Sequence, residues 1–129
     1  LAESGHNHSF CFNRKEAKDH GEGGSIIGAS LAGQVLIVDD VISAGVSVRE
    51  SVELIRAAGA TPCGVVIALD RMERGSGEMS AVQEVQHAYG IPVVSIVNLD
   101  SIMHYLEGRD DLVRHLHAVQ SYRTQYGVA

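Results

Sequence analysis

Blocks of apolar and polar residues follow one another along the chain in a pattern that predicts alternating strands and helices. The central block, residues 35–39, is an apolar run ending in a carboxylate, which is typical of a strand buried on both faces. Apolar residues then recur at Val48, Val52 and Ile55, which predicts a helix over about residues 45–58. Further strands are expected at about 9–13, 25–29, 63–69 and 93–97, and further helices ending near 89 and covering about 100–106 and 110–126.

Local signals refine these helices. Ser47 and Glu50 have the spacing of a capping box, which predicts that the first helix starts near Ser47. Asp100 is expected to cap the short third helix. The expected buried stripes are Met79, Val82, Val85 and Tyr89 in the second helix and Leu112, Leu116 and Val119 in the last. The alternation predicts an α/β fold, with a parallel sheet flanked by helices, in a single domain over residues 1–129.

Composition narrows the classes of function. The chain has 129 residues and a net charge of -6, which argues against general nucleic-acid binding. No apolar stretch approaches the roughly 20 residues of a membrane span. The two cysteines, Cys11 and Cys63, form no C-x-x-C motif, so we expect a reduced, cytoplasmic setting. No spacing typical of zinc ligands appears.

Two adjacent carboxylates, Asp39 and Asp40, stand at the end of the central strand. Ligands of open α/β sheets bind at the carboxyl ends of the strands. Carboxylates accept hydrogen bonds from sugar hydroxyls, and the start of the following helix can hold a phosphate. The alternative to a binding role is that one aspartate simply caps the following helix. Two adjacent aspartates before a Ser-Ala-Gly turn favour instead a site for a phosphorylated sugar. Because neighbouring side chains of an extended chain point to opposite sides, we expect one acid to face the hydroxyls and the other the reacting end or the water shell of a metal.

The turn after the carboxylates, residues 43–47, is the expected phosphate cradle. Ala44 and Gly45 allow close approach to the backbone, and Ser43 and Ser47 add hydroxyl donors.

Both lysines of the chain, Lys15 and Lys18, lie in one polar segment together with Arg14 and His20. The segment, residues 14–24, ends in glycines and reads as an exposed, mobile loop. The acidic residues of the segment cancel the positive charge of its basic residues, so a solvated loop without a function is one interpretation. The other is a loop that closes over a polyanion and stabilises negative charge on a leaving group.

Arg71 follows the strand over residues 63–69, so it is expected at the same edge of the sheet as the two aspartates. A surface salt bridge and a fork that grips a planar anionic ligand are both open interpretations.

Three segments together resemble a known family. The run over residues 35–45, VLIVDDVISAG, resembles the phosphoribosyl pyrophosphate signature of the type I phosphoribosyltransferases. Residues 12–24, FNRKEAKDHGEGG, are similar to the mobile catalytic loop of the orotate phosphoribosyltransferases, and residues 69–75, LDRMERG, also match that family. The resemblance runs from about Phe10 to the end of the chain.

The resemblance implies transfer of phosphoribose from phosphoribosyl pyrophosphate to orotate, with Mg²⁺ held mainly through substrate and waters, in a cytoplasmic homodimer whose loop reaches the partner's site. It implies that Asp39 and Asp40 face the ribose hydroxyls, that Ser43 and Arg71 contact orotate, and that Lys18 is the main catalytic side chain. The remaining catalytic residues would be Arg14, His20 and Asp40. Pyrophosphate would bind Arg14, Lys15, Lys18 and His20, and the 5'-phosphate would bind Val41, Ile42, Ser43, Ala44, Gly45, Val46 and Ser47.

Two departures from the family pattern stand out. Threonine is usual in the family where Ser43 and Val46 stand, so the phosphate contact at Val46 must rely on backbone N–H groups and Ser47. The family's N-terminal segment, which forms the hood over the base, is not seen, which leaves open whether this chain alone is active. Two other functions also stay open: transfer to another base such as a purine, and a regulatory module that binds phosphoribosyl pyrophosphate without turnover.

Overall fold

The computed structural model describes residues 2–13 and 26–128 of the chain. Its elements are η1 (Ala2–Ser4), β1 (Cys11–Asn13), β2 (Ile26–Gly28), β3 (Gln34–Asp39), α1 (Val46–Ala57), β4 (Thr61–Asp70), α2 (Ala81–Tyr89), β5 (Val93–Asn98), α3 (Leu99–Leu106), η2 (Asp110–Leu112) and α4 (Val113–Tyr126). No helix in this part of the chain is both long and apolar enough to cross a membrane.

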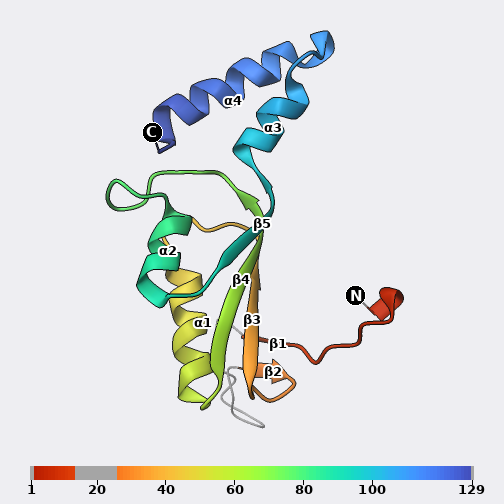
Figure 1. The fold of residues 1–129 in the computed structure, drawn as a ribbon, viewed down its shortest axis with the longest axis vertical. Helices are drawn as coiled ribbons and strands as arrows, with labels where there is room; N and C mark the ends of the chain where they lie inside the picture. Colours follow the sequence, from red (N-terminus) through yellow and green to blue (C-terminus); the bar gives the residue numbers. More distant parts are fainter. Residues whose placement is uncertain (1, 14–25, 129) are drawn as a thin grey trace, which may run out of the picture.

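A parallel sheet in the order β3-β4-β5 forms the centre of the fold. The crossovers β3-α1-β4 and β4-α2-β5 both move the chain in the same direction across the sheet. Because such crossovers are right-handed, α1 and α2 must cover the same face, as Figure 1 shows. The predicted α/β class is therefore confirmed.

The core lies between that face and the two helices. Ile67 and Val65 of β4 and Val48 and Val52 of α1 are almost completely buried. Around them packs the rest of the cluster: Ile37, Ile42, Ile55, Ala60, Ala81, Val85 and Ile91.

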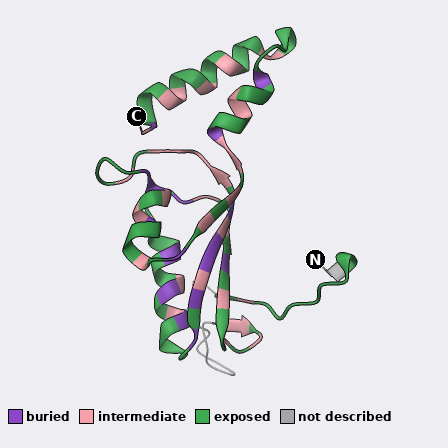
Figure 2. Ribbon diagram, viewed as in Figure 1, coloured by how far each residue is buried: buried purple, intermediate pink, exposed green. Residues whose placement is uncertain are grey.

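The opposite face of the sheet remains open to water. Leu36 and Val38 of β3 and Val94 and Ile96 of β5 alternate with the core positions, and their exposed fractions run from 53% to 80%. Figure 2 shows this alternation of buried and exposed positions along the strands. The prediction that the central strand is buried on both faces was wrong: in the described residues the second face of the sheet carries no helix, because both crossovers lie on the first.

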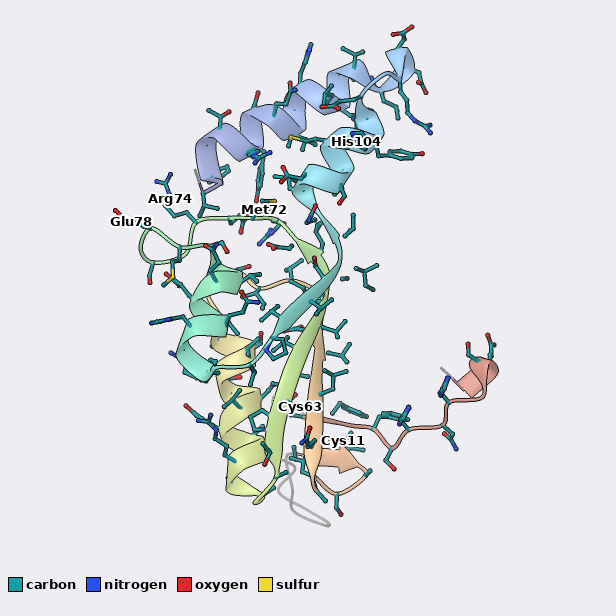
Figure 3. All side chains as sticks on the ribbon, in the orientation of Figure 1. Cys11, Cys63, Met72, Arg74, Glu78 and His104 are labelled. Carbon is teal, nitrogen blue, oxygen red and sulfur yellow. The ribbon has the colours of Figure 1, made fainter. Side chains whose placement is uncertain are left out.

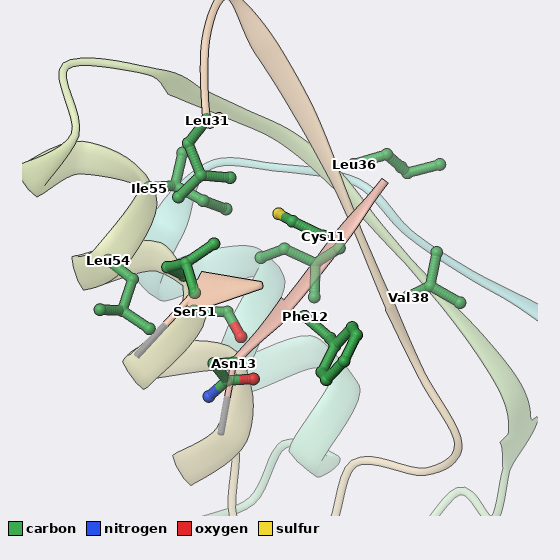
Figure 4. A pocket seen from close by; sticks show the side chains of 11 residues that line it. Cys11, Phe12, Asn13, Leu31, Leu36, Val38, Ser51, Leu54 and Ile55 are labelled. Carbon is green, nitrogen blue, oxygen red and sulfur yellow. The ribbon is translucent and has the colours of Figure 1, made fainter. Parts of the chain in front are cut away.

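A small antiparallel pair, β1 and β2, lies beside β3. It sits toward the end of the sheet where β3 begins, away from the end where Asp39 stands (Figure 1). A hollow of about 160 Å³ separates the pair from β3 and α1, and its lining includes Phe12, Val38 and Ile55 (Figure 4).

Two helices, α3 and α4, extend beyond the carboxyl edge of the sheet (Figure 1). They pack on each other, and Arg123 of α4 forms an ion pair with Asp100 of α3. The expected inward residues of α4, Leu112, Leu116 and Val119, are only half-buried, and no residue of this helix is fully buried.

Three local expectations were wrong. The cap of α3 is Asn98, whose side chain accepts from the Ser101 amide, and Asp100 lies inside the helix. The α2 helix starts later than its expected stripe, at Ala81, because Ser80 and Gln83 form a capping box. Met79 therefore precedes the helix and is 40% exposed. The third error, the capping box of Ser47, concerns the candidate site.

Candidate functional site

The carboxyl ends of the three parallel strands form one edge of the sheet, where Asp39, Asp70 and Asn98 stand as the last strand residues. Asp40, the turn to α1 and Arg71 follow directly at the same edge. The backbone carbonyl of Asp40 accepts from the amides of Ala68 and Leu69 at 2.9 and 3.1 Å, which fixes the start of the turn against β4. Parallel pairing thus brings together residues that lie about thirty positions apart.

Asp39 is half-buried and faces the start of α1. Its Oδ2 accepts a hydrogen bond from the Ser47 hydroxyl at 2.7 Å, and its Oδ1 accepts from the Asp40 amide at 3.0 Å. The expected capping box of Ser47 is therefore wrong. Ser47 is the second residue of α1, and its hydroxyl proton is donated back to the strand.

Asp40 is exposed, in contrast to Asp39. Its Oδ1 accepts from the Val41 amide at 2.6 Å, while Oδ2 has no hydrogen-bond partner among the described residues. A carboxylate oxygen at this position can accept a hydrogen bond from a ligand hydroxyl or from a metal-bound water. The two acids therefore differ in burial and in hydrogen-bond partners, and their separate roles toward a ligand stay a prediction.

The turn between Asp40 and α1 ends in Gly45, which has a φ of 65° and precedes the first helical residue. A Cβ there would meet a Val85 methyl at 3.2 Å, so both the backbone conformation and the space favour glycine. No side chain within the described residues caps the first turn of α1. The first amides of the helix are left to water or to an anion.

The other turn residues contribute in different ways. Ile42 is buried in the core, so only its backbone is available to a ligand. Ser43 and Ala44 are exposed, Val41 is half-buried, and the Val46 side chain is 45% exposed.

Arg71 connects the loop after β4 to the turn. Its Nη2 donates to the Ser43 Oγ at 2.8 Å and lies 2.9 Å from Oε2 of Glu73. Since Ser43 accepts this bond, its own hydroxyl proton remains available to a ligand. The Arg71 Nε is buried and has no partner within the described part of the chain. The guanidinium thus forms a salt bridge with Glu73 and a hydrogen bond with Ser43 of the turn, and the fork that grips a ligand stays a prediction.

A second acid, Glu84 of α2, holds the rest of the loop. Its Oε1 accepts from the Ser76 amide at 2.7 Å, the Ser76 hydroxyl at 2.8 Å and the Gly77 amide at 3.1 Å. The Ser76 hydroxyl bond is the main cause that lowers the pKa of this carboxyl, and the two amides add to it against the opposing effect of desolvation. Sequence reasoning missed both Glu73 and Glu84, because an isolated glutamate carries no signal of its partner.

The expected cationic group, Arg14, Lys15, Lys18 and His20, lies outside the described residues. The hollow beside β1 is not the carboxylate edge, because neither Asp39, Asp40 nor the turn residues line it. Within residues 2–13 and 26–128, no group of three or more His, Cys, Asp or Glu is arranged to hold a metal ion.

Comparisons with known proteins agree with this geometry. No protein-family model matches the chain. The chain is 71% identical over 126 residues to the orotate phosphoribosyltransferase of Nitrosospira multiformis, covering 98% of this chain and 55% of the relative. It is 64% identical over 127 residues to the orotate phosphoribosyltransferase of Nitrosomonas europaea, covering 98% and 56%.

Among solved structures, the orotate phosphoribosyltransferase of Francisella tularensis superimposes with a TM-score of 0.77 at 28% identity, over 97% of this chain and 59% of that one. The resemblance of the three sequence motifs is therefore confirmed along nearly the whole chain. The chain is a homologue of the orotate phosphoribosyltransferases, and it spans somewhat more than half of the length of these relatives.

Proposed function

We propose that this chain carries the substrate site of an enzyme that transfers phosphoribose from phosphoribosyl pyrophosphate to orotate, a step of pyrimidine biosynthesis. The products are orotidine 5'-monophosphate and pyrophosphate. The observation that carries the proposal is the link between Arg71 and Ser43 at 2.8 Å, beside the carboxylates of Asp39 and Asp40. It joins a base-binding cation to a sugar-phosphate cradle, and the 71% identity to a named orotate phosphoribosyltransferase supports it.

In this proposal the sugar phosphate lies along the turn. Asp40 and Asp39 accept hydrogen bonds from the ribose hydroxyls. The 5'-phosphate accepts from the amides of residues 41–47 and from the Ser43 hydroxyl, near the uncapped first turn of α1. The Ser47 hydroxyl, which is already donated to Asp39, orients that acid in the free protein.

Arg71 would bind orotate, whose carboxylate is a planar anion suited to a guanidinium fork. The Nη1 of Arg71 has no hydrogen-bond partner within the described residues, which supports this role. Glu73 would hold the guanidinium in place from the other side.

The reaction forms a bond between a ring nitrogen of orotate and the anomeric carbon and breaks the bond from that carbon to pyrophosphate. The leaving pyrophosphate takes the bonding electron pair, so negative charge builds on it while the ribose becomes positive. Asp40 stands where it could stabilise that positive charge, with Asp39 beside it. Cations that interact more strongly as the bond breaks accelerate the step, whereas equally tight binding throughout would not.

Those cations are proposed to be Arg14, Lys15, Lys18 and His20, with Lys18 contributing most. β1 and β2, which bracket this segment in the sequence, lie toward the end of the sheet opposite Asp39 (Figure 1). This arrangement supports a homodimer in which the segment of one copy completes the site of the other. We assign the enzyme to the cytoplasm, where the two free cysteines, Cys11 and Cys63, stay reduced.

Mg²⁺ belongs to the proposal as a cofactor that shares the negative charge of the pyrophosphate. The exposed carboxylate of Asp40 is a hard oxygen donor, which fits the water shell of this ion. Its remaining ligands would be substrate oxygens and waters.

The test is an assay of the intact protein with phosphoribosyl pyrophosphate and Mg²⁺ that follows the consumption of orotate and the release of pyrophosphate. Parallel assays replace orotate with adenine or hypoxanthine. Turnover with a purine and not with orotate would show that the enzyme transfers phosphoribose to a purine base. Binding of phosphoribosyl pyrophosphate without pyrophosphate release from any base would indicate a regulatory module.

Lys18→Ala provides the second arm, with Arg49→Ala on the exposed side of α1 as the control. Loss of Lys18 is expected to lower kcat by about 10²-fold or more while changing substrate KM much less. Unchanged turnover would remove Lys18 from the mechanism.

A further inference from the structure

The last residue of α4 and the two residues after it pair with the loop that follows β4. The Arg74 amide donates to the Tyr126 carbonyl at 2.8 Å, and the Val128 amide donates to the Met72 carbonyl at 3.1 Å. The Arg74 Nη2 also donates to the Gly127 carbonyl at 3.3 Å. Residues 126–128 are called the tail segment below. In Figure 3 the labelled Met72 and Arg74 lie directly beneath the C-terminal end of α4.

Gly127 is tightly packed in this contact. It is buried, and a Cβ on it would lie 2.6 Å from the backbone carbonyl oxygen of Arg123. A backbone atom cannot rotate away as a flexible side chain can, so a larger residue must displace the tail segment. Gly127 is also bridged to Glu73, the ion-pair partner of Arg71.

The loop held by the tail segment contains an unfavourable backbone conformation. Met72 has a φ of 53°, and it is the one non-glycine residue with positive φ in the described chain. Such a conformation costs on the order of 1 kcal/mol and persists where surrounding contacts hold it. Met72 is held on one side by Asp70, whose Oδ1 accepts from its amide at 2.8 Å, and on the other by Val128. Arg71 directly precedes Met72 and lies between it and Asp70 in the sequence.

The position of the tail segment is not set by packing of α4 against the hydrophobic core. α4 contributes no fully buried residue, and its ion pair with Asp100 connects it to α3 rather than to the sheet. The main contacts of the tail segment are therefore its hydrogen bonds with the Met72–Arg74 backbone, in the loop next to the site.

We propose that the tail segment positions Arg71 for binding of the base, with Gly127 and Val128 as positioning residues that touch no substrate. The inference rests on the proposed function, because it takes Arg71 as the orotate ligand. The 5'-phosphate cradle at residues 41–47 has no contact with the tail segment in the hydrogen bonds of the described chain. Displacing the tail segment should therefore affect orotate and spare phosphoribosyl pyrophosphate.

The experiment compares Gly127→Ala with Gly77→Ala in the intact protein. Gly77 lies in the same loop, and a Cβ there would meet only the Glu84 carboxylate oxygen at 4.0 Å, so it is the matched control. Amide hydrogen exchange over residues 71–76 is expected to become about tenfold faster in Gly127→Ala alone. The KM for orotate should rise about tenfold, with kcat and the KM for phosphoribosyl pyrophosphate within about twofold of the unsubstituted protein.

Arg74→Ala is the second variant, in case Gly127→Ala folds poorly. It removes only the side-chain bond to Gly127 and should shift both measurements in the same direction by a smaller factor. Unchanged exchange in both variants would overturn the proposal, and so would faster exchange without a change in the KM for orotate. If the unsubstituted protein does not use orotate, the proposed function fails instead, and hydrogen exchange alone still decides whether the tail segment holds the loop.

Discussion

The hydroxyl of Ser47 donates to Oδ2 of Asp39 at 2.7 Å, which ties the first turn of α1 to the last residue of β3. Through this bond Asp39 stabilises the contact between β3 and α1, which the adjacent Asp40 does not do. Asp40 keeps an unpaired carboxylate oxygen within the described residues and is exposed.

Alanine substitutions should separate the two acids. Asp39→Ala removes the acceptor of two hydrogen bonds and is expected to lower the free energy of unfolding by about 1 kcal/mol. Asp40→Ala should change it by less than about 0.5 kcal/mol. Urea denaturation measures both. Both variants should weaken the binding of phosphoribosyl pyrophosphate, and equal stability losses would contradict the assigned difference.

Gly45→Ala tests the turn, with Gly59→Ala as its control. Both glycines have positive φ, 65° and 76°, so both substitutions should cost about 1 kcal/mol of stability. Only the Cβ at position 45 meets a neighbour, the Val85 methyl at 3.2 Å. We therefore expect the KM for phosphoribosyl pyrophosphate to rise about tenfold in Gly45→Ala only. A rise of similar size in Gly59→Ala would attribute the effect to general loss of stability.

Arg71→Lys tests the forked geometry of the guanidinium. Lysine keeps the charge but cannot bond the Ser43 hydroxyl, Glu73 and a ligand carboxylate in one plane. The KM for orotate should rise by about tenfold or more, with a small change for phosphoribosyl pyrophosphate. Steady-state kinetics with each substrate varied in turn gives the answer. An unchanged KM for orotate in Arg71→Lys would show that only the positive charge at this position matters.

Glu84 gives the loop a dependence on pH. Because the folded state lowers the pKa of this carboxyl, its contribution is fully present above the ordinary glutamate pKa of about 4.3 and is lost as pH falls through the lowered value. Hydrogen exchange at Ser76 and Gly77 should be faster in Glu84→Gln than in the unsubstituted protein at neutral pH. The difference should shrink as the pH falls below the ordinary glutamate pKa and through the lowered pKa of Glu84. A difference that persists in strong acid would show that the charge is not responsible.

The sequence predicted the parts of the fold that depend on local periodicity. The helix over 45–58 and the strand over 35–39 lie within a residue or two of α1 and β3, because both have regular apolar spacing and clear breaks. Helix caps were less predictable. The hydroxyl of Ser47 bonds Asp39 of β3 and does not cap α1. The caps of α2 and α3 are Ser80 and Asn98, which form local bonds three residues ahead, so Met79 precedes its helix and Asp100 lies inside its own.

The candidate site divides in the same way. Asp39, Asp40 and the turn could be identified because they follow one strand in an unusual local pattern. The contact of Arg71 with Ser43, 28 positions away, follows from parallel pairing of β3 and β4 and was expected only as a shared edge. The pairing of Met72 with Val128 had no sequence signal, because backbone hydrogen bonds do not depend on residue type.

The uncovered face of the sheet has an energetic consequence. Leu36, Val38, Val94 and Ile96 are all more than half exposed, so most of their hydrophobic free energy has not been released in this fold. Complete burial of an aliphatic side chain of this size is worth about 1.5–3 kcal/mol. Any surface that displaced the water from these four side chains would gain a driving force comparable with the whole stability of a small domain.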